Sequence, residues 1–288
     1  MIVVGVDGSA AARAAVEWAA DDALRMRVPL RIVHAVDRSP YQIGKFPTAD
    51  WPDALLRQGH RVLADAAAVA RDRQPEIDVT TRVLEGPPAL VLREQADMAD
   101  DASGPADEVV IGTRGHGGFA GALLGSVSAH VAGQARSPVV VVRAEPHPVR
   151  GRIVVGVDDS PECEPALAYA FRQASLRGSE LRALHAWQLP VHAFAPEIAY
   201  DMDEVRQAQY RLVRDRVEAM EKEYPQVNVV EEVQSAHPVD ALGAASEEAD
   251  LVVVGSHGRG TLGSVLLGSV SRGVLHHAHC AVAVVRGR

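Results

Sequence analysis

The chain contains one sequence pattern twice, and this repeat constrains the fold more than any other feature. GTRGHGGFAGALLGSVS runs from Gly112 to Ser128, and GSHGRGTLGSVLLGSVS runs from Gly255 to Ser271. Both follow a short apolar run and fit one template, in which Gly, two residues, Gly and nine residues precede Gly-Ser. Upstream, VVGVDGS at Val3–Ser9 is echoed by VVGVDDS at Val154–Ser160. Self-similarity of this kind predicts two homologous halves.

The repeat divides the 288 residues into two halves that are each long enough to bury a core. The predicted domains are residues 1–146 and 149–288, with a short linker at Pro146–Pro148. No apolar run approaches the roughly 20 residues that cross a membrane. The first predicted strand begins at Ile2, which leaves no room for a signal peptide. We therefore expect a cytoplasmic protein without membrane insertion.

Composition argues against several classes of partner. The formal net charge is −9 and no cluster of Lys and Arg is present, which disfavours nucleic acid as a partner. Cys163 and Cys280 have no counterparts in the first half, so we expect no disulfide framework. The late histidines lack the ligand spacing of a metal site, and we expect no metal ligands at His276, His277 and His279.

Short apolar runs alternate with helical segments in both halves. Strands are expected at about residues 2–6, 30–36, 78–84, 109–111, 139–143, 153–157, 181–187, 228–234, 251–254 and 281–286. Ser9 is expected to cap the first helix, and Ser160, followed by Pro161, to cap its counterpart. Met98–Ala106 is an insertion in the first half and is expected to be exposed and mobile.

The alternation predicts an α/β fold with two tandem doubly wound domains. Each would hold a five-stranded parallel sheet of order 3-2-1-4-5 with helices on both faces. In that order the first and fourth strands are neighbours at the topological switch point, where ligands bind. The first strand leads to Asp7 or Asp158, and the fourth leads into the glycine-rich segment. We therefore expect a carboxylate and a glycine loop to face one crevice in each domain.

The residue types in this crevice suit a polyphosphate. Glycines let the backbone approach an anion, and consecutive amides form an anion-binding concavity. Ser126 and Ser269 stand where a new helix begins, so free amides and the positive end of the helix dipole are available. Asp7 and Asp158 are candidates to accept hydrogen bonds from ribose hydroxyls or to hold a metal-bound water. The alternatives are a flexible turn and a solvated capping residue, which the recurrence of the spacing disfavours.

Each loop also carries one arginine and one histidine, in swapped order. Arg114 and His116 stand in the first loop, and His257 and Arg259 stand in the second. If these imidazoles face phosphate, binding tightens below about pH 6.5, whereas exposed side chains on a polar loop are the alternative. A dinucleotide motif is rejected because Gly258–Gly263 follows the fourth strand, and a Walker A loop is rejected because no Lys follows the last glycine.

These segments together resemble the universal stress protein family. VGVDGS…VHAV…GTRGHGG…LLGSVS and VGVDDS…LHAW…GSHGRGT…LLGSVS cover nearly the whole chain. They are similar to tandem two-domain members of the ATP-binding branch, of the actinobacterial and mycobacterial type. The resemblance implies that the strand-end carboxylates contact the ribose or adenine, and that the pocket for the base is completed by Gly5, Ala35, Gly156 and Ala186.

The resemblance also implies that both glycine loops wrap phosphates. The residues implied in the first domain are Gly112, Thr113, Arg114, Gly115, His116, Gly117, Gly125, Ser126 and Ser128. Those implied in the second are Gly255, Ser256, His257, Gly258, Arg259, Gly260, Gly268, Ser269 and Ser271. Family members pair through their fifth strands, here Val139–Arg143 and Ala281–Arg286, so the resemblance implies that a tandem chain forms this pair internally and then dimerises again.

The expected function is that of a nucleotide-dependent regulator in stress or dormancy responses. It would bind one ATP per domain, with or without Mg²⁺, and act on an unidentified regulatory protein partner. Phosphoryl transfer needs a positioned nucleophile or base, and none is evident, so we assign no catalytic residue and expect at most slow hydrolysis. A slow ATPase or nucleotide hydrolase and an interaction module with vestigial sites remain alternatives, as do AMP and a cyclic nucleotide as ligands.

Overall fold

The computed structural model describes residues 1–37, 51–97, 104–115, 124–188, 201–258 and 267–287. The chain divides into two compact units, Met1–Pro146 and His147–Ser264 with Gly268–Gly287. Each unit has five strands and its own layers of helices, and each is described by itself.

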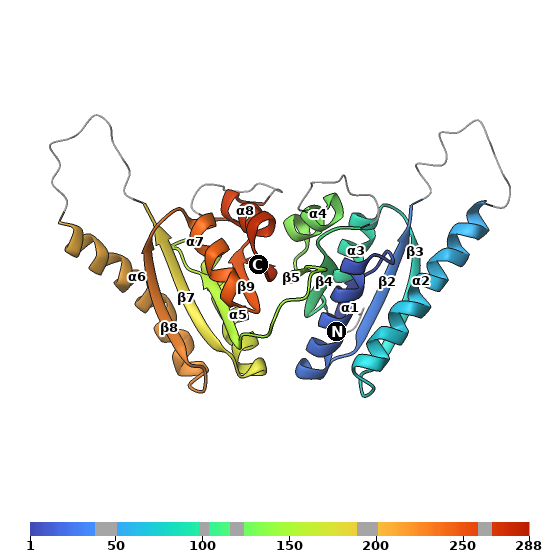
Figure 1. The fold of residues 1–288 in the computed structure, drawn as a ribbon, viewed down its shortest axis with the longest axis horizontal. Coiled ribbons are helices and arrows are strands. Elements are labelled where there is room, and N and C mark those ends of the chain that lie inside the picture. Colours follow the sequence, from blue (N-terminus) through green and yellow to red (C-terminus); the bar gives the residue numbers. More distant parts are fainter. Residues whose placement is uncertain (38–50, 98–103, 116–123, 189–200, 259–266, 288) are drawn as a thin grey trace, which may run out of the picture. The chain divides into compact units, whose positions relative to one another are not determined.

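The first unit alternates strands and helices (Figure 1). Its strands are β1 (Ile2–Gly5), β2 (Leu30–Val36), β3 (Val79–Glu85), β4 (Glu108–Gly112) and β5 (Val139–Val142). Its helices are α1 (Ala10–Met26), α2 (Trp51–Arg73), α3 (Pro88–Asp97) and α4 (Ser126–Gln134). Neighbouring strands are parallel and lie in the order β3-β2-β1-β4-β5. Helices α1 and α2 pack together on one face of the sheet, and α3 and α4 pack together on the other.

The second unit repeats this arrangement. Its strands are β6 (Arg152–Gly156), β7 (Glu180–Trp187), β8 (Val229–Ser235), β9 (Leu251–Gly255) and β10 (Ala281–Val285). Its helices are α5 (Cys163–Arg177), α6 (Met202–Glu223), α7 (Pro238–Ala245), a 3-10 helix (Ser246–Glu248) and α8 (Ser269–His277). The parallel order is β8-β7-β6-β9-β10. The α/β fold with two tandem parallel-sheet domains that the sequence predicts is therefore confirmed.

The central strands are apolar because helices cover both of their faces. Every Val, Ile and Leu of the central strands is buried, in β1 and β4 of the first unit and in β6 and β9 of the second. The edge strands β3 and β8 contain half-buried and exposed residues and carry most of the polar side chains. This contrast between continuous apolar strands and polar edges is what a doubly covered parallel sheet requires.

The two first helices begin differently, and one prediction about them is wrong. Ser9 caps α1 as expected, since its Oγ accepts the N–H of Ala12 at 3.2 Å. Helix α5, however, begins at Cys163, and its N-cap makes no side-chain hydrogen bond. A helix starting at Pro161 would place the ring of Pro165 against the carbonyl four residues earlier. Beginning at Cys163 leaves Pro165 in the first turn, where no N–H is needed.

The insertion near Met98–Ala106 also differs in part from the expectation. Residues 98–103 lie outside the described residues, but Ala106 is buried, and its N–H bonds to the carbonyl oxygen of Ala96 at 2.7 Å. Gly104 and Pro105 are exposed, as expected, but the last residue of the insertion is held against α3. Among the helices of the described segments, none has the length and apolar character that crossing a membrane demands.

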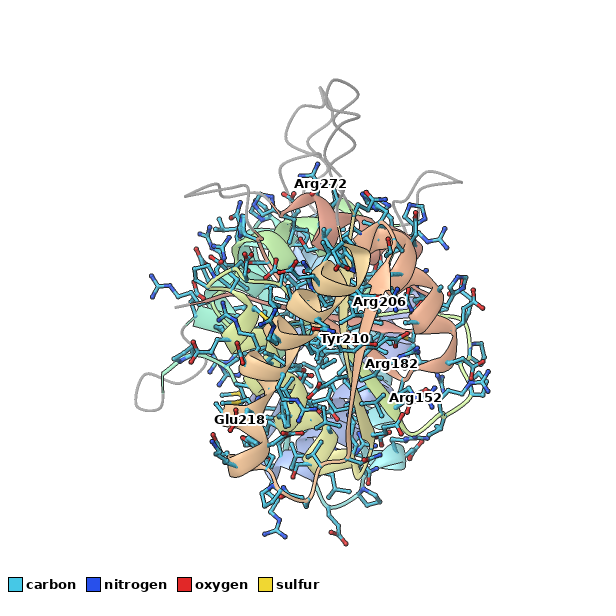
Figure 2. All side chains as sticks on the ribbon, turned by 90° about the vertical axis from the view of Figure 1, so that its left-hand side faces the viewer. Arg152, Arg182, Arg206, Tyr210, Glu218 and Arg272 are labelled. Atoms are coloured by element: carbon cyan, nitrogen blue, oxygen red, sulfur yellow. The ribbon has the colours of Figure 1, made fainter. Side chains whose placement is uncertain are left out.

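One side of the second unit carries Arg152 and Arg182, which Figure 2 shows on the side that faces the viewer, and both pair with glutamates. The Nε of Arg152 lies 2.8 Å from Glu180 Oε1, and Arg182 is bonded to Glu232 on the neighbouring strand. Burial is the largest single influence and would raise the pKa of Glu232, but the hydrogen bonds from Arg182 and Gln234 and the charges of Arg182 and Arg152 together lower that pKa. These arginines thus sit opposite carboxylates and do not add up to a basic surface.

Candidate functional site

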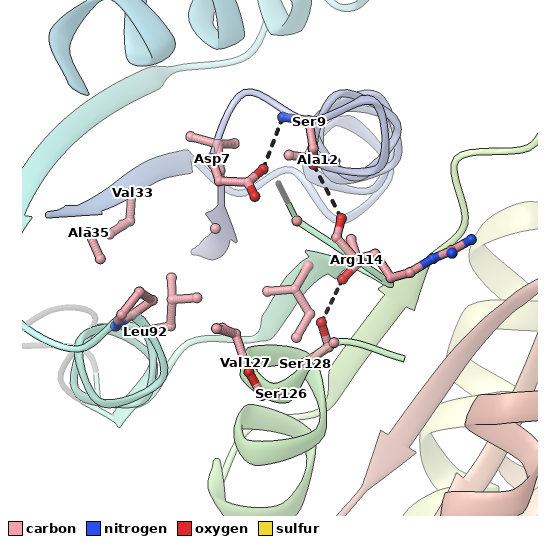
Figure 3. Close-up of a pocket in the computed structure, with 17 residues that line it drawn as sticks. Asp7, Ser9, Ala12, Val33, Ala35, Leu92, Arg114, Ser126, Val127 and Ser128 are labelled. Carbon is pink, nitrogen blue, oxygen red and sulfur yellow. Dashed lines mark hydrogen bonds between the residues drawn. The ribbon is translucent and has the colours of Figure 1, made fainter. Parts of the chain in front are cut away.

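A cavity of about 250 Å³ opens at the carboxyl ends of the strands in the first unit (Figure 3). It lies between the end of β1, the end of β4 and the start of α4, which is the switch point of the sheet. Nine of the predicted residues line it: Gly5, Asp7, Ala35, Gly112, Arg114, Gly115, Gly125, Ser126 and Ser128. The structure therefore brings together the two sequence motifs that the sequence analysis placed at one crevice.

The Asp7 carboxylate lies directly against the glycine loop. Its Oδ1 accepts the N–H of Ser9 at 3.0 Å, as Figure 3 shows. Its Oδ2 would stand only 2.1 Å from a Cβ at position 115, so the contact requires Gly115. The Ser9 hydroxyl also donates to the carbonyl oxygen of Arg114 at 3.3 Å. The start of α1 and the loop after β4 are thereby joined around the carboxylate.

In the second unit the Asp158 carboxylate lies against Gly258 in the same way, but at a greater distance. Asp158 Oδ1 accepts the N–H of Ser160 at 3.0 Å and also the Ser160 hydroxyl at 2.5 Å. A Cβ at position 258 would lie 3.0 Å from Asp158 Oδ2. The Ser160 side chain is therefore committed to the carboxylate, which is why it does not cap α5.

The glycine loops are held in shape by their own polar groups. In the first unit the N–H of Gly125 donates to Thr113 O at 2.7 Å, and Ser128 Oγ donates to Gly112 O at 2.7 Å. In the second, the Gly268 N–H and Ser271 Oγ both donate to Ser256 O, at 2.9 and 3.0 Å. Thr113 and Ser256 are themselves buried. These serine hydroxyls therefore help to hold each loop in its folded shape.

Both loops end at a helix N-terminus, as the sequence predicts. Helix α4 begins at Ser126 after the N-cap Gly125, and α8 begins at Ser269 after the N-cap Gly268. Neither N-cap makes a side-chain hydrogen bond, so the cap leaves the first-turn amides to other partners. The positive end of each helix dipole adds to this attraction for an anion.

The first cavity also has an apolar lining, and sequence reasoning missed it. This lining includes Ala12, Val33, Leu92, Ile111 and Val127. In a sequence these residues cannot be told from ordinary core residues, because the lining of an apolar pocket and the hydrophobic core use the same side chains. The available signal was the repeat itself, since the second half has apolar residues at each equivalent position. An apolar slot beside a few polar groups is typical of a small-molecule site.

Several predicted loop residues have other neighbours or are not described. The Arg114 guanidinium lies 3.9 Å from Glu145 Oε1, and His257 Nδ1 lies 3.0 Å from Ser256 Oγ. Gly255 borders Glu162, since a Cβ there would lie 3.2 Å from Glu162 Cβ. Four further predicted residues lie outside the described residues: His116, Gly117, Arg259 and Gly260. Among the described residues, no three His, Cys, Asp or Glu side chains gather as a metal site would need.

Comparison with known proteins identifies the family. The model of the universal stress protein family matches residues 1–143 and again residues 150–286. The chain belongs to the universal stress protein family. Two universal stress proteins of Mycobacterium tuberculosis (strain ATCC 25618 / H37Rv), Rv2005c and Rv2623, are each 36% identical over 293 residues, covering 99% of this chain and 96% of their own. A solved universal stress protein from Archaeoglobus fulgidus has the same fold, with a TM-score of 0.71 at 21% identity over 99% of this chain and 96% of its own.

The two domains of this universal stress protein differ at the apolar wall. Leu184 pairs with Gly156 as Val33 pairs with Gly5, so the second site has the larger side chain. Cys163 stands in the sequence where the first domain has Ala12. Its thiol is buried, and burial raises its pKa to about 11, so it is neutral. Of the other predicted residues, Gly156 borders Leu242 and Ala186 lies on β7. The second wall thus contains more atoms at two positions.

Proposed function

We propose that this universal stress protein binds one ATP in each domain, residues 1–146 and 149–288, and acts as a nucleotide-dependent regulator in stress or dormancy responses. The observation that supports this best is the first cavity, where a strand-end carboxylate, a glycine loop and a helix N-terminus meet. The family membership adds to this support. The remaining predicted site residues enter as part of the same proposal.

The residues present fit an adenine nucleotide at both ends. At the base end, Val33 and Leu92 supply apolar surface, and Gly5 has no Cβ to obstruct a flat ring. At the other end, the amides around Gly115 and the start of α4 suit phosphate oxygens. Asp7 stands between these ends, where its carboxylate would accept a ribose hydroxyl or hold a water of Mg²⁺.

The same geometry favours binding over rapid catalysis. The titratable carboxylate in the first cavity is that of Asp7, and one of its oxygens already accepts the Ser9 N–H. A carboxylate engaged in this way is suited to orient a ligand and is a weak general base. We propose at most slow ATP hydrolysis. The slow-ATPase alternative rests on the same Asp7, as the group that would place a metal ion or a water.

Three further elements of the proposal concern the surroundings of the protein. We propose a cytoplasmic location, a homodimer and an unidentified regulatory protein partner. The opposed Arg–Glu pairs of the second unit give no basic surface there, which favours a protein partner over nucleic acid.

The first test identifies the nucleotide that accompanies the purified protein. Freshly purified chain is denatured by heat, and the released nucleotide is identified and counted by chromatography. About two ATP per chain supports the proposal, whereas ADP alone favours the slow ATPase. If nothing is released, calorimetric titration with ATP, with and without Mg²⁺, follows. No binding at millimolar ATP would contradict the proposal and favour vestigial sites.

A further inference from the structure

Two histidines contact the chain just before the candidate carboxylates. His34 on β2 and His185 on β7 occupy equivalent positions of the two domains. Nδ1 of His34 lies 2.7 Å from the carbonyl oxygen of Val6, and Nδ1 of His185 lies 2.6 Å from that of Val157. A carbonyl oxygen only accepts hydrogen bonds, so each Nδ1 must carry the proton. Each ring therefore donates to the residue that directly precedes the carboxylate.

These hydrogen bonds act on the peptide unit that carries the carboxylate residue. The carbonyl of Val6 and the N–H of Asp7 belong to one planar unit, so fixing the carbonyl also fixes the Asp7 Cα. The N–H of Val6 is held in turn by Val33 O at 2.9 Å. The paired part of β1 ends at Gly5, so the hydrogen bond from His34 fixes the backbone one residue beyond the strand. Two consecutive peptide units are thus anchored directly before Asp7.

The second domain repeats each of these contacts. The N–H of Val157 donates to Leu184 O at 2.9 Å, and its carbonyl accepts from His185, which is buried. Asp158 follows directly and lies beside the second glycine loop. The same arrangement in two domains that differ at their apolar walls indicates that it serves the part they share, which is the carboxylate facing the loop.

The outer helices hold the rings from the other side of each sheet. Val33 and Ala35 line the first cavity, so His34 between them points to the opposite face, toward α2. There a Cβ at position 59 would lie 2.8 Å from His34 Cδ2, so the ring needs Gly59.

In the second domain the ring is held by a side chain of α6. His185 Nε2 lies 2.9 Å from the amide oxygen of Gln209. The amide oxygen and nitrogen of Gln209 interchange by a half-turn, so the Gln209 amide can pair with Nε2 either as acceptor or as donor. Gln209 precedes Tyr210 on α6, which Figure 2 shows on the side that faces the viewer. Both ring nitrogens of His185 therefore have partners.

We propose that His34 and His185 are positioning residues for nucleotide binding. Each holds the peptide unit that presents the adjacent carboxylate to the ligand, without touching the ligand itself. This role rests on the proposed ATP binding and adds the groups that keep the carboxylate in place.

The decisive comparison is His34→Leu against His34→Asn, titrated with ATP in the full chain. Asn places an amide nitrogen where Nδ1 stands, whereas Leu fills the space and cannot donate. Loss of one hydrogen bond should weaken the first site about tenfold in Leu, with the second site unchanged. The Asn variant should stay within about threefold of wild type. His185→Leu should weaken ATP binding at the second site by about the same factor and leave the first site unchanged.

A second variant keeps the test decisive if the Leu substitution prevents folding. Gly59→Ala retains the His34 side chain but pushes its ring away from α2. This variant should therefore weaken ATP binding at the first site, whereas alanine does not destabilise the helix itself. Nitrogen-15 spectra of the wild type should show both rings protonated at Nδ1. Equal weakening by Leu and Asn, or Nε2-protonated rings, would overturn the role of the Nδ1 donor.

The outcomes separate this inference from the function on which it rests. If the wild type does not bind ATP, the proposed function fails and the positioning role fails with it. If the wild type binds ATP and His34→Leu and Gly59→Ala bind it equally well, the function stands and only the positioning role is overturned.

Discussion

Replacing Gly115 by alanine tests the contact on which the candidate site depends. The new Cβ would stand 2.1 Å from Asp7 Oδ2, whereas ordinary contacts begin at 3.4 Å. The carboxylate must therefore retreat by about 1.3 Å, which it does by rotating its side chain. Because the obstacle is the end of a flexible side chain, the free energy of unfolding should change by less than about 1 kcal/mol.

The effect on ligand binding should be much larger than the effect on folding. A carboxylate turned out of place loses a charged hydrogen bond to the ligand, which contributes about 1.5–3 kcal/mol. That range corresponds to about a tenfold to a hundredfold weaker first site. Gly258→Ala should have a smaller effect at the second site, since its Cβ would lie 3.0 Å from Asp158 Oδ2.

Calorimetric titration with ATP and denaturant unfolding together measure both effects. Gly112→Ala is the contrasting variant, because its Cβ would lie 2.7 Å from a backbone carbon of Ala11 that cannot rotate away. It should lower the free energy of unfolding by about 1–3 kcal/mol. If Gly115→Ala binds two ATP with wild-type affinity, the carboxylate at the loop does not hold the nucleotide, and the reasoning is refuted.

Four further results are expected. Gly243 lies within α7, and a Cβ there would meet only His277 Cβ on α8, at 3.9 Å. Gly243→Ala should therefore raise the free energy of unfolding by about 0.5–1 kcal/mol in denaturant titrations, and a loss of stability would contradict this. Burial would raise the pKa of Asp21, but hydrogen bonds from Arg73 lower it overall below its ordinary value of 3.8. Asp21 therefore contributes stability above that pH, and Asp21→Asn should cost about 1 kcal/mol at pH 7, a difference that shrinks as the pH falls below 3.8. The Cys163 thiol, with a pKa raised by burial to about 11, should resist Ellman's reagent at pH 8 until the chain is unfolded. Leu184→Val should tighten ATP at the second site in calorimetry and leave the first unchanged, and no change at either site would show that the wall does not limit binding.

Much of this architecture follows from local sequence patterns. Apolar runs such as Val139–Val142 and the spacing around Gly112 predict strands and loops, because strand burial and tight turns impose requirements on neighbouring residues. The late start of α5 was also available locally, since Pro165 excludes a helix that begins at Pro161. The start signal of Ser160 and Pro161 is therefore overridden by the second proline, Pro165.

The repeated sequence by itself determined two α/β domains, each with a glycine loop after the fourth strand, because these depend on periodicity and spacing along the chain. Only the tertiary structure decided which side chains surround the loop. Leu92 comes from α3 and Val33 from β2, and His34 on β2 reaches Val6, which follows the neighbouring strand β1. Such contacts depend on strand register and on the direction in which each helix packs. Both are set by the packing of residues that are distant in sequence, and no local pattern records them.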